Sequence, residues 1–154
     1  MRISLICVGR LGRSPEAILA RDYAERATAA GRALGLGPVD IVEVEARKPG
    51  KAAEAEAILG KSGQARLIAC DEHGRAMTSR EFAARLAALR DEGVRALALV
   101  IGGADGLGEA LLDAARDRLA FGPQTWPHAL ARVMLAEQVY RAATILAGAP
   151  YHRD

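Results

Sequence analysis

The chain has 154 residues, 51% of them hydrophobic and 26% charged, and carries a net charge of +2. This length suffices for one domain with a substantial core and is short for two, and the composition is that of an ordinary globular protein. The near-neutral charge excludes a protein that holds bare RNA by electrostatic attraction alone.

No segment is predicted to target the chain elsewhere or to cross a membrane. The first nine residues are too short for a signal peptide, and no apolar run reaches membrane-spanning length. The two cysteines, Cys7 and Cys70, lie in apolar runs without a disulfide or zinc-ligand spacing, and the three histidines also lack ligand spacing. We therefore expect a cytoplasmic protein with no membrane partner and no metal.

Apolar runs alternate with helical stretches along the first hundred residues. Ser14-Pro15-Glu16 predicts a helix that ends near Gly31, and residues 51–59 predict a second helix that stops at Gly60. A capping box over residues 78–81 begins a third helix, which ends at Gly93. The alternation predicts one α/β domain over residues 1–154, with helices on both faces of a mostly parallel sheet. Its four predicted strands are residues 3–8, 39–44, 66–70 and 96–101.

The pattern changes after residue 101. A glycine-rich turn opens a short helix over 108–116, a brief apolar segment covers 119–121, and the loop 122–127 leads into a long helix over 128–147. Apolar residues occur nearly all round this last helix, so it must be buried nearly all round. The sheet of so small a domain covers one side only, and we therefore predict a second subunit on the other.

Two loops have competing interpretations. The turn Gly102-Gly103-Ala104-Asp105-Gly106 lacks the spacing of a dinucleotide fingerprint and the Lys-Ser/Thr of a P-loop. It is either a tight strand-to-helix turn or a place where backbone without Cβ atoms approaches a ligand. Residues 47–51, which include Arg47, Lys48 and Lys51, form either a solvated loop or an RNA contact.

The C-terminal residues Pro150-Tyr151-His152-Arg153-Asp154 are unusual for a chain end, which is commonly frayed and chemically bland. Tyrosine and histidine suit stacking on a base, and arginine suits pairing with phosphate. The tail is therefore either frayed or a nucleotide-binding segment.

Four motifs in this order resemble those of the bacterial large-subunit ribosomal RNA pseudouridine N3-methyltransferases, a family within the SPOUT superfamily. They are residues 99–106, 127–133, 136–142 and 150–154, and the opening Cys7-Val8-Gly9 and the loop 47–51 also fit. The resemblance covers the whole chain. The family usually has Pro-Glu in place of Ala104-Asp105, His in place of Ala149, and Glu in place of Asp154.

The resemblance implies a SPOUT-type α/β knot, in which the C-terminal segment of a mostly parallel sheet protein forms a deep trefoil knot. Such knots are too rare to be proposed from periodicity. The resemblance also implies S-adenosylmethionine as cofactor, a homodimer, and methyl transfer to N3 of a pseudouridine in 23S ribosomal RNA of assembled ribosomes. In proteins of this family the tail of one subunit reaches the cofactor of the other, and the resemblance implies the same arrangement here.

The motifs also imply site residues. The base is positioned, and removal of its N3 proton is assisted, by Tyr151, His152 and Arg153. The site is shaped by His128 and Arg132. The cofactor positions are Cys70, Gly102, Gly103, Phe121, Gly122, Pro123, Gln124, Thr125 and Trp126.

Two other functions remain open at this point. One is a SPOUT methyltransferase that acts on another RNA such as transfer RNA, against which the short tail with Tyr151-His152-Arg153 argues. The other is a non-catalytic α/β module that binds a ligand, and such a module would transfer no labelled methyl group to any RNA.

Overall fold

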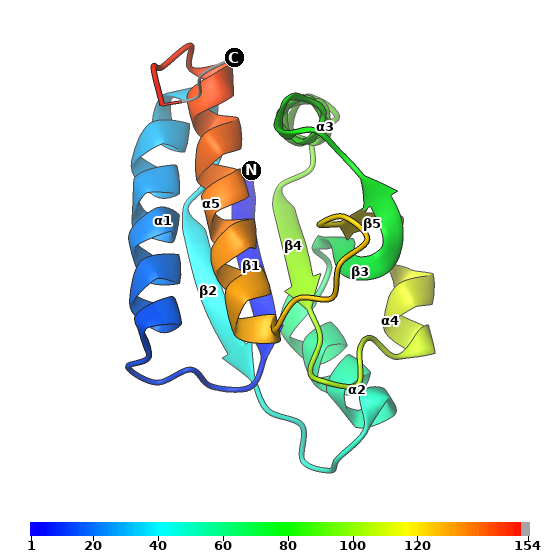
Figure 1. Cartoon of the computed structure of the whole chain (residues 1–154). Helices are drawn as coiled ribbons and strands as arrows, with labels where there is room; N and C mark the ends of the chain where they lie inside the picture. Colours follow the sequence, from blue (N-terminus) through cyan, green and yellow to red (C-terminus); the bar gives the residue numbers. More distant parts are fainter. Residues whose placement is uncertain (152–154) are drawn as a thin grey trace.

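Five parallel strands form one sheet in the computed structural model, which describes residues 1–151. The strand order is β2-β1-β4-β3-β5, and every neighbouring pair is parallel (Figure 1). Such an order requires each connection to cross a face of the sheet, which is where the helices lie. The strands are β1 (Arg2–Val8), β2 (Val39–Val44), β3 (Arg66–Ala76), β4 (Ala96–Ile101) and β5 (Asp117–Ala120).

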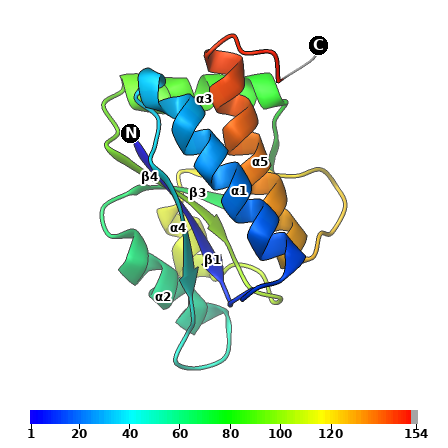
Figure 2. The ribbon, with the colours of Figure 1, turned by 90° about the vertical axis from the view of Figure 1, so that its left-hand side faces the viewer.

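The helices form a layer on each face of the sheet (Figures 1 and 2). One layer holds α1 (Pro15–Gly31), α3 (Ser79–Asp91) and α5 (His128–Leu146), and the other holds α2 (Lys51–Ser62) and α4 (Glu109–Ala114). A single turn of 3-10 helix, η1 (Arg32–Leu34), follows α1.

Side chains of the central strand β4 divide between two cores. Leu97 and Leu99 pack under the layer of α1, α3 and α5, whereas Ala98 and Val100 pack under α2 and α4. All four are essentially inaccessible to solvent. Because successive side chains of a strand point to opposite faces, an apolar run without polar alternation is what a doubly covered strand requires.

Several boundaries expected from the sequence are confirmed. The Ser14 side chain accepts a hydrogen bond from the Ala17 N–H at the start of α1, and the capping box of Thr78 and Glu81 begins α3. The strands over 39–44 and 96–101 begin and end where expected. These are elements whose signals are local, either a cap or an uninterrupted apolar run.

Three expectations about element boundaries were wrong. Helix α2 continues through Gly60, which is exposed in open space, and ends at Gly63, where φ is +54°. Strand β3 runs on to Ala76 after a register shift between Cys70 and Arg75. The edge strand β5 was not predicted, because its four residues include the charged Asp117 and Arg118 and so show no apolar run.

Helix α5 is covered on more sides than we expected. It packs over β1 and β4, with α1 alongside it in both views and α3 on its other flank. The sheet is therefore not its only cover within the chain. What remains uncovered is an outer strip near its beginning, where Leu130 is 41% exposed.

The path of the chain into α5 bears on the expected knot. From β5 at one edge of the sheet, residues 121–127 carry the chain back to the beginning of α5 over β1 and β4. The trefoil knot itself stays a prediction. No helix among residues 1–151 is long and apolar enough to cross a membrane.

The buried face of α5 should contribute much of the stability. We expect Leu135→Ala to lower the free energy of unfolding by about 2–5 kcal/mol, because the completely buried side chain leaves a cavity. The matched control is Ile18→Ala on α1, which removes a side chain that is 61% exposed and should cost less than about 0.5 kcal/mol. Urea unfolding measures both variants, and equal losses would contradict the assignment of the core.

Candidate functional site

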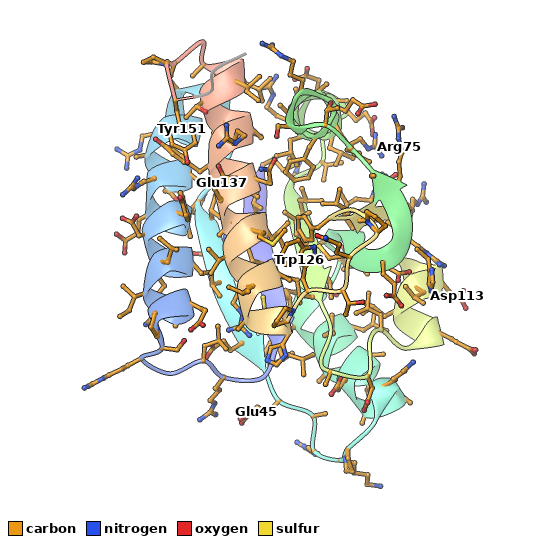
Figure 3. The ribbon with its side chains drawn as sticks, viewed as in Figure 1. Glu45, Arg75, Asp113, Trp126, Glu137 and Tyr151 are labelled. Carbon is orange, nitrogen blue, oxygen red and sulfur yellow. The ribbon has the colours of Figure 1, made fainter. Side chains whose placement is uncertain are left out.

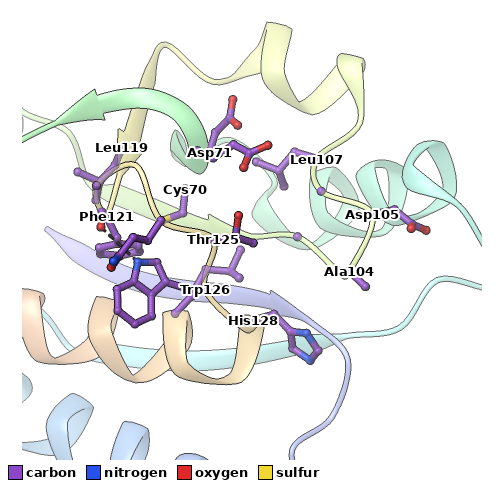
Figure 4. Close-up of a pocket in the computed structure, with 18 residues that line it drawn as sticks. Cys70, Asp71, Ala104, Asp105, Leu107, Leu119, Phe121, Thr125, Trp126 and His128 are labelled. Carbon is purple, nitrogen blue, oxygen red and sulfur yellow. Dashed lines mark hydrogen bonds between the residues drawn. The ribbon is translucent and has the colours of Figure 1, made fainter.

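A cavity of about 280 Å³ opens at the carboxyl ends of β3 and β4 (Figure 4). Cys70, where β3 stops pairing with β4, and Ile101, the last residue of β4, line it together with two loops, residues 102–107 and 121–126. The first residues of α5 contribute His128 and Ala131. The carboxyl edge of a parallel sheet is where such folds commonly bind ligands, and the volume lies at the lower end of the range for small-molecule sites.

The glycine loop is shaped by its own backbone contacts. The Gly106 N–H donates to the Gly103 carbonyl at 3.1 Å, and Gly106 has φ of +81°. A Cβ on Gly102 would lie 2.9 Å from the Gly106 carbonyl oxygen and 2.8 Å from a Leu107 methyl carbon. The absence of a side chain at Gly102 is thus required by the turn itself, while the backbone of Gly102 and Gly103 still lines the cavity.

Helix α2 anchors the same loop. The Gly103 N–H donates to the Glu54 carboxylate at 3.3 Å, and a Cβ on Gly103 would lie within 2.8 Å of that carboxylate. Gly108 packs as tightly, since its Cβ would lie 2.6 Å from the Lys51 carbonyl oxygen. Close packing against the backbone of α2 therefore explains Gly108, whereas a side chain at Gly103 would meet only the movable end of Glu54.

The second loop is closed by a tryptophan. The Trp126 indole N–H donates to the Phe121 carbonyl at 3.3 Å, which brings the two ends of the loop together. The Phe121 ring packs against the core below the loop. Of the nine cofactor positions that the motifs imply, all but Pro123 line the cavity.

Acidic side chains dominate the polar part of the cavity. Asp71, Glu72 and Asp105 line it, and no lysine or arginine of residues 1–151 does. The Asp71 carboxylate lies 3.7 Å from Arg118, and the Glu72 carboxylate lies 3.6 Å from His73. A cavity of this charge attracts cations and repels phosphate groups.

The sequence analysis missed these acidic residues, although a signal was present. Asp71 and Glu72 directly follow the apolar part of β3, and polar residues just after a buried strand commonly reach the ligand-binding edge of a parallel sheet. Within residues 1–151, no group of three histidine, cysteine or acidic side chains could hold a metal ion.

Both cysteines lie near the cavity without offering a reactive thiolate. Cys70 lines it and Cys7 lies in the core behind it. Burial raises the pKa of Cys7 to about 12, and burial likewise raises the pKa of Cys70. Because the thiolate is the nucleophilic form, neither side chain is suited to nucleophilic chemistry at neutral pH.

His128 and Arg132, which the motifs imply shape one site, have different surroundings in the structure. His128, the first residue of α5, is exposed and lines the cavity. Arg132 is only 2% exposed and does not line it. Its guanidinium donates to Glu43 at 2.6 Å and to the Val8 and Gly9 carbonyls at 3.3 and 3.1 Å, so it joins α5 to the ends of β1 and β2.

The tail lies apart from the cavity of its own chain. Helix α5 is roughly 28 Å long at ~1.5 Å per residue, and Tyr151 follows its far end (Figure 3). The Tyr151 hydroxyl donates to Glu137 at 3.2 Å, its ring lies 4.5 Å from that of Tyr140, and Arg141 covers it at 4.9 Å. His152 and Arg153 lie outside the described residues.

The surroundings of Tyr151 change the pKa of its hydroxyl group. Burial, followed by hydrogen bonding to Tyr23 and the charge of Glu137, raises the pKa of Tyr151. Its hydroxyl therefore stays protonated at neutral pH and acts as a hydrogen-bond donor in this arrangement.

Comparison with known proteins shows to which family a chain with this fold and cavity belongs. The family model described as "Predicted SPOUT methyltransferase" matches residues 1–152. The chain belongs to this family. Two of its relatives, from Phenylobacterium zucineum and Caulobacter vibrioides, are 67% and 66% identical over 154 residues, covering all of this chain and 100% and 99% of theirs. Each is called "Ribosomal RNA large subunit methyltransferase H".

Solved structures agree with the family at the level of the fold. A probable methylase family protein from Haemophilus influenzae has a TM-score of 0.57 at 14% identity, over 99% of this chain and 70% of its own. A probable methyltransferase from Bordetella pertussis has a TM-score of 0.55 at 19% identity, over 92% of this chain and 96% of its own. The sequence-based assignment to the SPOUT methyltransferases is confirmed.

The contacts of Arg132 predict a strong effect on stability. We expect Arg132→Ala to lower the free energy of unfolding by about 3 kcal/mol, because it removes the guanidinium from two carbonyls and leaves Glu43 with only the Leu11 N–H. Arg26→Ala, which breaks an exposed pair with Asp22 one helical turn away, should cost at most ~0.5 kcal/mol. If denaturant titrations give the two variants the same midpoint, Arg132 does not tie the helix to the sheet.

Proposed function

We propose that this chain methylates N3 of a pseudouridine in large-subunit (23S) ribosomal RNA of assembled ribosomes, with S-adenosylmethionine as methyl donor. Membership of a methyltransferase family and the shared name of the relatives support a ribosomal RNA substrate. The tail motif, by its resemblance, supports the pseudouridine. The observation that carries the proposal is the acid-lined cavity at the carboxyl edge of the sheet.

The lining residues fit this cofactor better than they fit a nucleotide phosphate. S-adenosylmethionine, when bound, supplies a methyl group activated by a positively charged sulfur, and it also carries an ammonium group. Asp71, Glu72 and Asp105 complement these positive charges, while Leu119 and Phe121 offer apolar surface. We assign cofactor binding to Cys70, Gly102, Gly103, Phe121, Gly122, Pro123, Gln124, Thr125 and Trp126.

We assign handling of the target base to the tail and to His128. Tyr151, His152 and Arg153 hold the nucleotide, and the protonated Tyr151 hydroxyl is suited to donating a hydrogen bond. Holding two reactants in line lowers the barrier by roughly 7–11 kcal/mol, and the remaining need is removal of the N3 proton. His128 lines the cavity and is placed to assist there. Arg132, through Glu43 and the β1 carbonyls, fixes the start of α5 that carries His128.

The separation of Tyr151 from the cavity supports a homodimer in which one subunit's tail completes the other subunit's site. A surface for the contact is available on the outer side of α1 and α5. Ile18 and Leu19 on α1 and Leu130 on α5 are 61%, 44% and 41% exposed, high values for large apolar side chains in this chain. Val133 and Met134 are half-buried on the same helix. Grouped exposed apolar residues of this kind commonly mark protein contacts.

Methyl transfer with a blocked cavity tests the proposed activity. The parent protein should transfer labelled methyl from S-adenosylmethionine to ribosomes from a strain that lacks this gene, and not to transfer RNA. Ala131→Phe should abolish both cofactor binding in calorimetry and transfer, because the ring fills the cavity that Ala131 lines. Ala110→Phe, at an exposed position of α4 outside the cavity, is the matched control.

Each result of this test assigns one function. A parent protein that labels transfer RNA instead would be the other kind of SPOUT enzyme, and one that binds the cofactor without labelling any RNA would be a binding module. Cofactor binding that survives in Ala131→Phe would remove the cavity assignment.

Shortening and mixing of subunits test the tail. A chain that ends at Pro150 should lose methyl transfer while keeping cofactor binding, because Tyr151 lies beyond α5 and the cofactor loops lie earlier. Arg153→Ala should slow transfer by roughly 100-fold if it misplaces the base. Arg153→Lys should recover only part of this, since an ammonium lacks the guanidinium fork.

Mixed dimers show whether the site is shared. Blocked-cavity chains and tail-deleted chains, each inactive alone, should regain activity when they are combined in one dimer. Full activity of the tail-deleted chain would refute a catalytic tail, whereas a parent protein that scatters light as a folded monomer would refute the shared site.

A further inference from the structure

A second cleft, of about 580 Å³, lies at the amino ends of β3 and β4. Arg66 from the start of β3, Arg95 from the segment before β4, and Arg116 from the turn between α4 and β5 all line it, together with Gln64. No aspartate or glutamate is part of its lining among the described residues. This cleft has no part in the site proposed above, which uses the opposite ends of the same strands.

The three arginines differ from most others in the chain. Arg2, Arg26 and Arg75, for example, each lie within 4 Å of a carboxylate, at 3.6, 2.7 and 2.8 Å. The side chains of Arg66, Arg95 and Arg116 make no ion pair or hydrogen bond within residues 1–151. A chain with 19 acidic residues could have neutralised them. Because the three lie in one cleft whose described lining has no carboxylate, their positive charges are available to one ligand.

We propose that this cleft binds phosphate groups of the substrate RNA at a distance from the base that is methylated. Guanidinium groups match phosphate oxygens as paired donors, and the Gln64 amide adds a neutral donor. The six residues of β4 separate the two clefts by roughly 17–20 Å. A ligand that reaches both must be extended, as an RNA backbone is. The inference rests on the proposed function for the identity of the RNA.

A purely structural role for the arginines makes different predictions. Helices α2 and α4 end at this edge, with Ser62 and Ala114 in the lining, and cations stabilise the carboxyl ends of helices. Loss of such a role lowers the unfolding midpoint and leaves RNA affinity unchanged. Loss of a phosphate contact lowers the RNA affinity. It leaves the unfolding midpoint unchanged, because Arg95 and Arg116 are exposed.

RNA binding by a double variant tests the proposal. Arg95→Ala/Arg116→Ala should bind ribosomes from a strain that lacks this gene about 10- to 50-fold more weakly near 0.1 M salt, with a salt-dependence slope lower by about 2. Arg95→Lys/Arg116→Lys should recover most of the affinity, since it keeps both charges. The control Arg32→Ala/Arg75→Ala removes the same charge from exposed positions outside the cleft and should change affinity far less.

The outcomes separate this proposal from the proposed function. Equal RNA affinity of the cleft variant and the control would overturn the cleft proposal, as would a lowered unfolding midpoint with unchanged affinity. If the parent protein and the cleft variant bind RNA equally while only the parent protein binds inorganic phosphate, the cleft belongs to free phosphate and the proposal is overturned too. Methyl transfer by the parent protein is measured in parallel. Cleft-dependent RNA binding without transfer would keep the cleft and remove the proposed function.

Discussion

Burial of β4 on both faces decides where this molecule can carry polar chemistry. Leu97, Ala98, Leu99 and Val100 are at most 1% exposed, so nothing polar can enter along the strand. Charged groups are confined to its two ends, where the loops of neighbouring parallel strands also gather. One end meets the acid-lined cavity and the other meets the arginine-lined cleft. The two sites thus have opposite charge and share their supporting strands.

Helix α5 links the cavity to the tail and also keeps them apart. His128 at its beginning lines the cavity, and Tyr151 beyond its end rests on Glu137, Tyr140 and Arg141. A rigid helix cannot shorten this separation, and this is the physical reason for proposing a site shared between two chains. The overall charge is a poor guide to RNA binding for a separate reason. The value of +2 is the sum of local regions of either sign, such as the acid-lined cavity and the arginine-lined cleft.

Glycine and arginine show how far residue types alone can mislead. The glycines of the loop 102–108 suggest close approach to a ligand, but Gly102 and Gly108 are required by contacts with the backbone of Gly106 and Lys51. Arg132 belongs to a motif beside His128 and yet is turned into the protein, where it binds Glu43. His128 and Arg132 are one turn apart and share a face of α5, but His128 stands at the end of the helix beside the cavity, whereas Arg132 meets the ends of β1 and β2.

The sequence by itself determined the class of fold, most element boundaries, the family and half of the cavity lining. These properties depend on local signals: the apolar runs of β2 and β4, the caps of Ser14 and Thr78, and motifs whose order is specific. Only the tertiary structure decided that Asp71, Glu72 and Asp105 share the cavity, that Arg132 does not line it, and that Arg66, Arg95 and Arg116 meet in one cleft. Each of these sets combines residues from separate elements, and their proximity follows from the strand order β2-β1-β4-β3-β5, which no local pattern encodes.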